Sequence, residues 1–224
     1  MNYRIFVGYD PREAVAFHVC VNSIIRHSSV PVSITPLALT NIQDYREGHK
    51  DASNQFVYSR FLIPHLCNNK GWALFIDGDM ILKSDIKELF DLIEPDKAVM
   101  VVKHNYKTRA AKKYLNSQNQ DYPRKNWSSV VLWNCESWLN RSLKPEFIEK
   151  ASGSDLHRFS WLPDERIGEL PLEWNWLPQE FGIWDRAKLI HYTLGTPCFK
   201  EYANDFMAED WHNELKLTNY CQQR

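Results

Sequence analysis

Hydrophobic residues fall into short apolar runs that are separated by polar turns and by stretches of helical periodicity. A continuous run such as 3–8 (YRIFVG) is typical of a strand buried on both faces. Six strands are predicted, at 3–8, 30–39, 71–82, 97–104, 128–134 and 187–195. Helices or helical turns are predicted at 12–27, 53–66, 84–93 and 136–150, and in part of the tail from 200.

Turn-forming residues set the expected limits of these elements. Asp10-Pro11 ends the first strand, Pro64 is expected to break the helix over 53–66, and Ser84 is the expected N-cap of the next helix. The polar stretch 105–125 is interpreted as an exposed loop or a weak helix. The stretch 151–185, dense in Trp, Pro and Glu, shows little periodicity and receives no element.

The alternation of strands and helices defines the expected fold class. It predicts an α/β fold with a mostly parallel, Rossmann-like central sheet flanked by helices. In such sheets, ligands gather beyond the carboxyl ends of the strands. A chain of 224 residues without a repeat or a linker is expected to form one domain over 1–224.

The charge balance and the cysteine spacing limit the partners and the cellular location that we expect. The 27 basic and 28 acidic residues give a formal net charge of −1, which provides no electrostatic reason to expect nucleic acid or an anionic membrane as partner. No apolar run is long enough to span a bilayer, and the N-terminus does not resemble a signal peptide. The five cysteines are scattered without a CxxC pair, which favours a reducing, cytoplasmic location.

The segment 73–82 (ALFIDGDMIL) carries the most informative chemistry. Asp77 and Asp79 follow an apolar strand, and side chains two positions apart in an extended chain point to the same side, about 7 Å from each other. Gly78 between them lets a ligand or another backbone come close. Two carboxylates on one side favour a hard divalent cation with oxygen ligands, Mn²⁺ or Mg²⁺. Such an ion usually keeps positions open for substrate phosphates.

Two other interpretations of this segment remain. Asp-Gly is a common turn dipeptide, so the pair could be a surface acidic turn. Phosphatases of the haloacid dehalogenase type also place two aspartates, one residue apart, after an apolar strand. Those enzymes usually carry the motif on the first strand and have Thr or Val where this chain has Ile81, which argues against them.

Several segments together resemble glycosyltransferase family 8, which includes glycogenin and bacterial galactosyl- and glucosyltransferases. They are IFVGYD at the first strand, YSRFLIPHL before ALFIDGDMIL, the ELPLEWNW stretch, and LIHYTLGTP near the end. The resemblance spans 3 to about 199. It implies a GT-A-type fold and a divalent metal held by Asp77, Asp79 and His191.

The same resemblance implies a pocket for a nucleotide sugar. Gly8, Tyr9 and Asp10 would line the nucleoside, with Tyr9 offering a stacking face for the base. Arg60 would reach the phosphate or the sugar of the donor, and Gly195 would let the diphosphate approach the backbone. Each has an ordinary structural alternative, such as an exposed Tyr in a turn or a solvated Arg on an amphipathic helix.

The chain departs from the family pattern at three places. The Asn-x-Gly expected near 128–134 is absent, so Asn126 or Ser128 would take that place in nucleotide-sugar binding. The Lys expected after the His loop is also absent, and Lys200 or Lys188 would have to replace it. The Asp-Gln-Asp segment of the family appears here only as PDE, in which Asp164 is the candidate catalytic residue. Arg60 is the second candidate catalytic residue.

The resulting hypothesis is transfer of a hexose from a nucleoside diphosphate sugar to a hydroxyl group. The resemblance favours uridine diphosphate and retention of the anomeric configuration, and it leaves open whether the acceptor is a glycan, a lipid or a protein. A sugar nucleotidyltransferase is the second candidate, although residues 9–13 lack the glycine-rich loop that cradles a triphosphate. A non-catalytic nucleotide-sugar-binding relative is the third.

Overall fold

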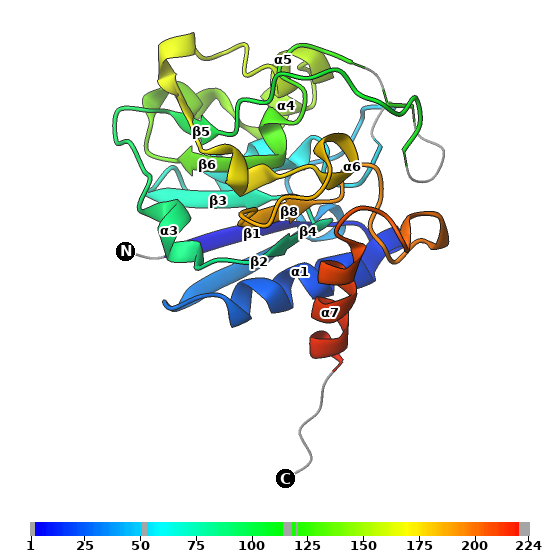
Figure 1. The fold of residues 1–224 in the computed structure, drawn as a ribbon. Helices are drawn as coiled ribbons and strands as arrows, with labels where there is room; N and C mark the ends of the chain where they lie inside the picture. Colours follow the sequence, from blue (N-terminus) through cyan, green and yellow to red (C-terminus); the bar gives the residue numbers. More distant parts are fainter. Residues whose placement is uncertain (1–2, 51–52, 114–117, 120, 220–224) are drawn as a thin grey trace.

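A six-stranded sheet runs through the middle of the molecule (Figure 1). The computed structural model describes residues 3–50, 53–113, 118–119 and 121–219. The strands of this sheet are β1 (Tyr3–Tyr9), β2 (Val32–Ala38), β3 (Trp72–Ile76), β5 (Val99–Val101), β6 (Val130–Asn134) and β7 (Ile167–Glu169).

The strand order is β2-β1-β3-β6-β5-β7, and five of the six strands run in the same direction. β6 is the exception, because it pairs antiparallel with β3 on one side and with β5 on the other. The mostly parallel sheet expected from the sequence is therefore present. The reversal of β6 brings its first residues next to the carboxyl end of β3, where Ile76 pairs with Val130.

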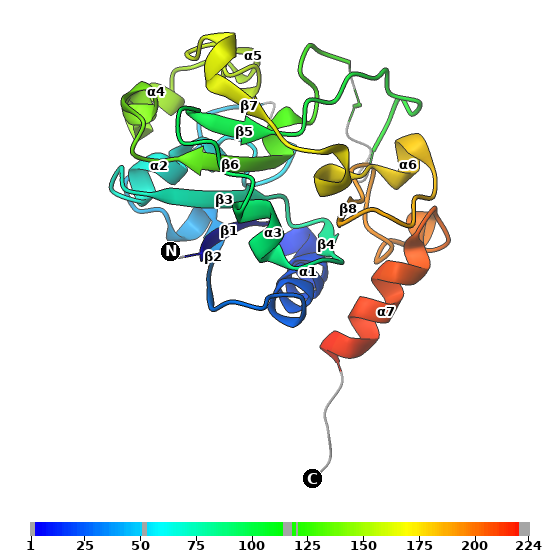
Figure 2. The same cartoon turned by 60° about the vertical axis from the view of Figure 1, so that its left-hand side comes forward.

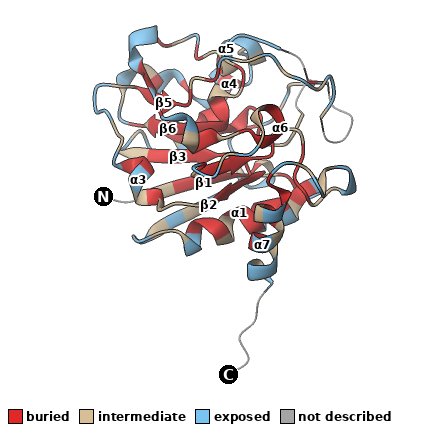
Figure 3. Ribbon diagram, viewed as in Figure 1, coloured by how far each residue is buried: buried red, intermediate tan, exposed pale blue. Residues whose placement is uncertain are grey.

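The inner strands β1, β3, β5 and β6 are largely buried on both faces, as their apolar runs indicate, whereas the edge strand β2 is partly exposed (Figure 3). Phe6, Phe75 and Trp133 point to one face, which is covered by the helical segments η3 (Ser59–Leu62), α2 (Ile63–Leu66), η6 (Trp138–Ser142), α4 (Pro145–Ile148) and α5 (Gly153–His157). Ile5 and Leu74 point to the other face, which is covered by α1 (Ala14–Arg26) and α3 (Ile86–Phe90). Alternate side chains of each strand thus enter two separate apolar layers.

A second, two-stranded sheet lies beyond the carboxyl end of β3. It pairs β4 (Met80–Leu82) antiparallel with β8 (Leu189–His191). α6 (Pro178–Phe181) precedes β8, and the last helix, α7 (Ala208–Thr218), lies beside α1 in both views (Figures 1 and 2). Ile81, Ile190 and Trp211 share a third apolar cluster that joins this sheet to α7.

Some element limits differ from the sequence-based expectation. Pro64 lies in the first turn of α2, where its missing N–H costs nothing, so it begins a helix and does not break one. Asp85, not Ser84, caps α3, because its carboxylate accepts the backbone N–H of Lys87. β7 was not predicted at all. Among the described residues, no helix is both long and apolar enough to cross a membrane.

Candidate active site

The two aspartates leave the end of β3 in a tightly fixed backbone. Asp77 donates its N–H to the carbonyl of Ser129, and Asp79 accepts the N–H of Tyr192, at 3.1 and 3.0 Å. Gly78 between them passes directly over β1, where an added Cβ would lie 2.2 Å from the carbonyl oxygen of Gly8. The absence of a side chain at Gly78 therefore serves the close approach of another backbone.

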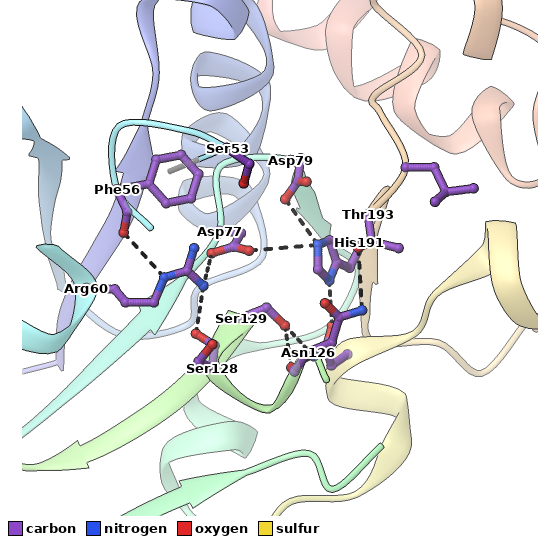
Figure 4. Close-up of polar contacts among 12 residues, drawn as sticks. Ser53, Phe56, Arg60, Asp77, Asp79, Asn126, Ser128, Ser129, His191 and Thr193 are labelled. Atoms are coloured by element: carbon purple, nitrogen blue, oxygen red, sulfur yellow. Dashed lines mark hydrogen bonds and ion pairs between the residues drawn. The ribbon is translucent and has the colours of Figure 1, made fainter. Parts of the chain in front are cut away.

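His191, the last residue of β8, completes a three-residue cluster with the aspartates (Figure 4). Its Nε2 lies 3.3 Å from Oδ1 of Asp79 and 3.9 Å from Oδ2 of Asp77. Each of the three residues offers one potential ligand atom, and these three atoms all lie within 4.8 Å of one another. The pairing of Met80 with His191 across β4 and β8 sets this geometry, so the second sheet delivers the imidazole to the end of the first.

Arg60 holds Asp77 from the other side (Figure 4). Its Nη1 lies 2.9 Å from Oδ1 of Asp77 and also donates to the carbonyl of Ser128, while Nε donates to the carbonyl of Phe56. The guanidinium lies over the rings of Phe56 and Phe75, at 5.3 and 4.9 Å from their centroids. Burial raises the pKa of Asp77 to about 6 even though the charge of Arg60 opposes this shift.

Asn175 fixes the orientation of the imidazole. Its Nδ2 donates to Oγ of Ser129 at 2.8 Å and to the carbonyl of Asn126 at 3.3 Å, so its Oδ1 faces Nδ1 of His191, 3.0 Å away. Because that oxygen can only accept, Nδ1 carries the proton. This tautomer directs the lone pair of Nε2 to the aspartates, which is the arrangement that binds a metal.

These side chains fit a divalent cation. Oδ1 of Asp79 is buried, and within the described part of the chain no donor makes a hydrogen bond to it. Buried carboxylate oxygens without hydrogen bonds are costly, and a cation would compensate them. Two carboxylates and one neutral imidazole form a donor set suited to Mn²⁺, with positions left for phosphate oxygens.

The cluster opens into a polar cleft of about 620 Å³. Arg60, Asp77, Asp79, Ser128 and His191, all predicted from the sequence, line it. Its other lining residues are Lys50, Ser53, Asn54, Val57, Tyr58, Lys113, Gln118, Asn119, Tyr122, Lys125, Asn126, Ser129, Gly153, Ser154, His157, Arg158 and Thr193.

His157 and Ser128 form one further polar pair in this cleft. Nδ1 of His157 lies 2.7 Å from Oγ of Ser128. Burial lowers the pKa of His157 to about 3, so the ring is neutral at pH 7. A neutral imidazole can donate or accept a hydrogen bond here, but it adds no charge to the cleft.

The first-strand residues that were expected to bind the nucleoside do not line the cleft. Gly8 lies under the ring of Phe56, and Tyr9 packs edge-on against Phe17. Asp10 is buried and caps the turn at Pro11–Glu13. Burial opposes its charge, but hydrogen bonds from Arg12 outweigh this effect and lower the pKa of the carboxyl. In this structure Asp10 therefore anchors the turn.

The remaining candidates also lie apart from the cleft. Gly195 adopts a φ of 153° and accepts a hydrogen bond from Gln179. The side chain of Asp164 is 82% exposed and pairs with Arg124 at 2.6 Å, which gives it no contact with the cluster. Lys188 pairs with Glu88 and Glu173, and Lys200 is exposed. None of these four residues lines the cleft.

Comparison with known proteins agrees with this geometry. The sequence model of glycosyl transferase family 8 matches residues 20–196. Protein CDI of Arabidopsis thaliana is 42% identical over 226 residues, covering 97% of this chain and 87% of that protein.

Solved structures show the same fold at low sequence identity. The galactosyltransferase LgtC, in complex with donor and acceptor sugar analogs, superimposes with a TM-score of 0.69 at 12% identity, with 98% of each chain covered. The bifunctional glycosyltransferase WbbM superimposes with a TM-score of 0.67 at 16% identity, covering 96% of this chain. The chain spans 49% of the WbbM chain, about half its length.

The sheet, the second sheet at its carboxyl edge and the Asp-Asp-His cluster define a glycosyltransferase with the GT-A fold. Within that class, the chain belongs to glycosyl transferase family 8.

Two features of the site were not predicted from the sequence. Asn175 lies in the ELPLEWNW segment, and the pairing of Trp176 with Ile190, which the sequence does not indicate, places this segment beside β8. Lys113 comes from the stretch 105–125, whose polar composition indicates an exposed loop. Its side chain instead enters the cleft, and composition gives no signal for that.

Proposed function

We propose that this glycosyltransferase moves a hexose from a uridine diphosphate sugar to a hydroxyl group, with Mn²⁺ or Mg²⁺ held by Asp77, Asp79 and His191. The buried cluster of these three residues at the mouth of a polar cleft is the observation that carries the proposal. We further propose that residues 1–224 act as one transferase domain, that the anomeric configuration is retained and, on cysteine spacing alone, that the protein is cytoplasmic.

The residues of the chain divide the work in this proposal. A bound divalent cation would act as a Lewis acid for the negative charge that grows on a leaving diphosphate. Arg60 keeps Asp77 ionised and oriented, since its N–H groups are directed to that carboxylate and to two backbone carbonyls. Arg60 is thus a positioning residue in this proposal.

The two carboxylates and the imidazole are held in a pre-organised arrangement. The carboxylates come from a strand end that is bonded to β6 and β8, and the imidazole is fixed by Asn175. A site whose dipoles and charges are already aligned needs little rearrangement as charge develops during the reaction. Its placement beyond the carboxyl end of β3 is the position at which open α/β sheets bind ligands.

The test is release of UDP from UDP-hexoses in the presence of Mn²⁺, together with the rise in melting temperature that UDP and Mn²⁺ produce. A ligand at a hundredfold excess over its Kd stabilises the native state by about 2.7 kcal/mol. Asp79→Ala should abolish both effects. Asp91→Ala, an exposed carboxylate on α3 that pairs with Lys87, is the matched control and should retain both.

The outcome that would contradict the proposal is equally specific. If the wild-type chain binds UDP equally well with Mn²⁺ and with EDTA, the cluster is not a metal site for a diphosphate. Release of pyrophosphate from UTP and a hexose 1-phosphate, without release of UDP from UDP-hexoses, would indicate a nucleotidyltransferase. Binding without any turnover would indicate a non-catalytic relative.

A further inference from the structure

Lys113 occupies an unusual place in the cleft. Lys113 belongs to the polar stretch 105–125. Its side chain lines the same cleft as the two aspartates. Its one hydrogen bond to a described residue is a long one, 3.4 Å from Nζ to Oγ of Ser53. Lys113 is half-buried, and over the described ranges it makes no ion pair that would offset the cost of withdrawing part of this cationic side chain from water.

The charges around Lys113 explain how the ammonium is tolerated there. Burial lowers the pKa of Lys113, whereas the carboxylates of Asp79 and Asp77 oppose this shift from across the cleft. The attraction depends on the negative charge of the two aspartates. A divalent cation between them would neutralise that charge and leave Lys113 without the attraction that offsets its burial. A second anion is then needed on the cleft side of the cluster.

Two other cations of the cleft are already engaged, whereas Lys50 and Arg158 line it but are not among the main charges that act on Asp77. Arg60 pairs with Asp77, and Lys125 donates to Oδ1 of Asn119 at 2.6 Å. Lys188 pairs with Glu88 and does not line the cleft. Lys113 therefore lines the same cleft as both aspartates, is attracted by their charge, and has no carboxylate partner among the described residues.

We propose that Lys113 binds the diphosphate of the nucleotide, opposite the divalent cation held by Asp77, Asp79 and His191. This inference rests on the proposed function and names the chain's own cationic contact for the leaving group. The ammonium donates to phosphate oxygens on the side away from the metal. The growing negative charge of the diphosphate is then balanced from two directions, and loss of Lys113 weakens binding without disturbing the metal ligands.

Two affinities measured on the same variants test the proposal. The first is the Kd of UDP with saturating Mn²⁺, by calorimetry, and the second is the Kd of Mn²⁺ alone, by the electron paramagnetic resonance signal of the free ion. Lys113→Met should raise the Kd of UDP roughly 10- to 100-fold, the effect expected for one charge-assisted hydrogen bond. Its Kd for Mn²⁺ alone should stay equal or fall, because a repelling charge has been removed.

Matched variants separate this role from a change in folding. Lys112→Met removes an exposed neighbour and should bind both ligands as the wild type does. Lys113→Arg keeps the charge and should recover most of the UDP affinity. A parallel loss of UDP and Mn²⁺ affinity in Lys113→Met would overturn the inference, because the lysine would then act through the metal site.

The remaining outcomes distinguish the two proposals. Equal UDP affinity in the Lys112→Met and Lys113→Met proteins, in a wild type that binds UDP with Mn²⁺, would overturn the role of Lys113 and leave the proposed function intact. A wild-type chain that binds no UDP with Mn²⁺ would overturn both.

Discussion

Nδ1 of His191 lies 3.0 Å from Oδ1 of Asn175, and this contact sets which nitrogen of the imidazole is free to bind a metal. Asn175 is itself fixed, because its amide nitrogen donates to Ser129 and to the carbonyl of Asn126 at the start of β6. The imidazole of β8 is therefore oriented by the same strand end that borders the aspartates. A neighbour that holds a metal-binding histidine in this way influences metal affinity without touching the metal.

Replacement of Asn175 tests this relationship. Asn175→Ala removes the acceptor for the Nδ1 proton, so the imidazole can rotate or change tautomer. We expect the affinity for Mn²⁺ alone to fall about 10- to 100-fold, the usual effect of losing such a partner. Titration of the free Mn²⁺ resonance signal measures it. Asn213→Ala, on the exposed side of α7, is the control, and equal affinity in the two variants would contradict the prediction.

Arg60 and Asp77 should behave as an energetically coupled pair. Arg60→Met leaves the carboxylate of Asp77 buried without its partner, and we expect the free energy of unfolding in EDTA to fall by roughly 3 kcal/mol. The double variant Arg60→Met/Asp77→Asn should recover part of this loss, because no uncompensated charge remains. Urea unfolding of the four proteins in a double-mutant cycle gives the coupling. Strictly additive losses would show that the pair is not coupled.

Asp77 should also make the metal-free protein sensitive to pH. Because burial raises its pKa to about 6 in the folded state, the folded state holds the proton more firmly than the unfolded state does. Its contribution to stability is complete below about pH 4 and is lost as the pH rises through 6. The wild type should therefore lose roughly 2 kcal/mol relative to Asp77→Asn between pH 4 and pH 7 in EDTA.

Urea unfolding at intervals of half a pH unit would show this dependence. The difference between the wild type and Asp77→Asn isolates the one carboxyl from all other titrating groups. A difference that stays constant over this range, or that changes in favour of the wild type as the pH rises, would contradict the raised pKa.

Gly78 has a steric role that a single methyl group tests. In Gly78→Ala the new Cβ would meet the carbonyl of Gly8 at 2.2 Å, so β1 and the turn between the aspartates must move apart. Overpacking of this kind costs roughly 1–3 kcal/mol. We expect that loss in urea unfolding, together with weaker Mn²⁺ binding. Gly48→Ala has no atom within 4 Å of its new Cβ and should change neither.

The central strands could be predicted because both of their faces are buried. β1 and β3 appear as continuous apolar runs, and a run of that length between polar turns has few other interpretations. β7 could not be predicted, since its three residues (IGE) show no period and its place is set by pairing with β5. The helix over 53–66 was expected from its apolar spacing, but the chain forms only short turns there before α2.

Some residues of the candidate site could be predicted from the sequence, and others could not. Asp77 and Asp79 are visible in the sequence because they directly follow a strand. His191 lies 112 positions after Asp79 in the numbering, and only the resemblance to a family linked it to them. Asn175 and Lys113 were not predicted, because their roles depend on which segments lie beside β8 and the cleft. Asp164 illustrates the converse, since a partial motif match gave it a role that its exposed position does not support.

The reversed direction of β6 has a consequence for how the enzyme can diversify. In a uniformly parallel sheet, the connection that precedes a strand arrives at the edge opposite the ligands. Here the residues just before β6 arrive at the same edge as Asp77, so Asn126 and Ser128, together with Lys113, form one wall of the cleft. Substitutions or insertions in this wall can alter which sugars are accepted, while the two strands that present the metal ligands keep their sequence and their geometry.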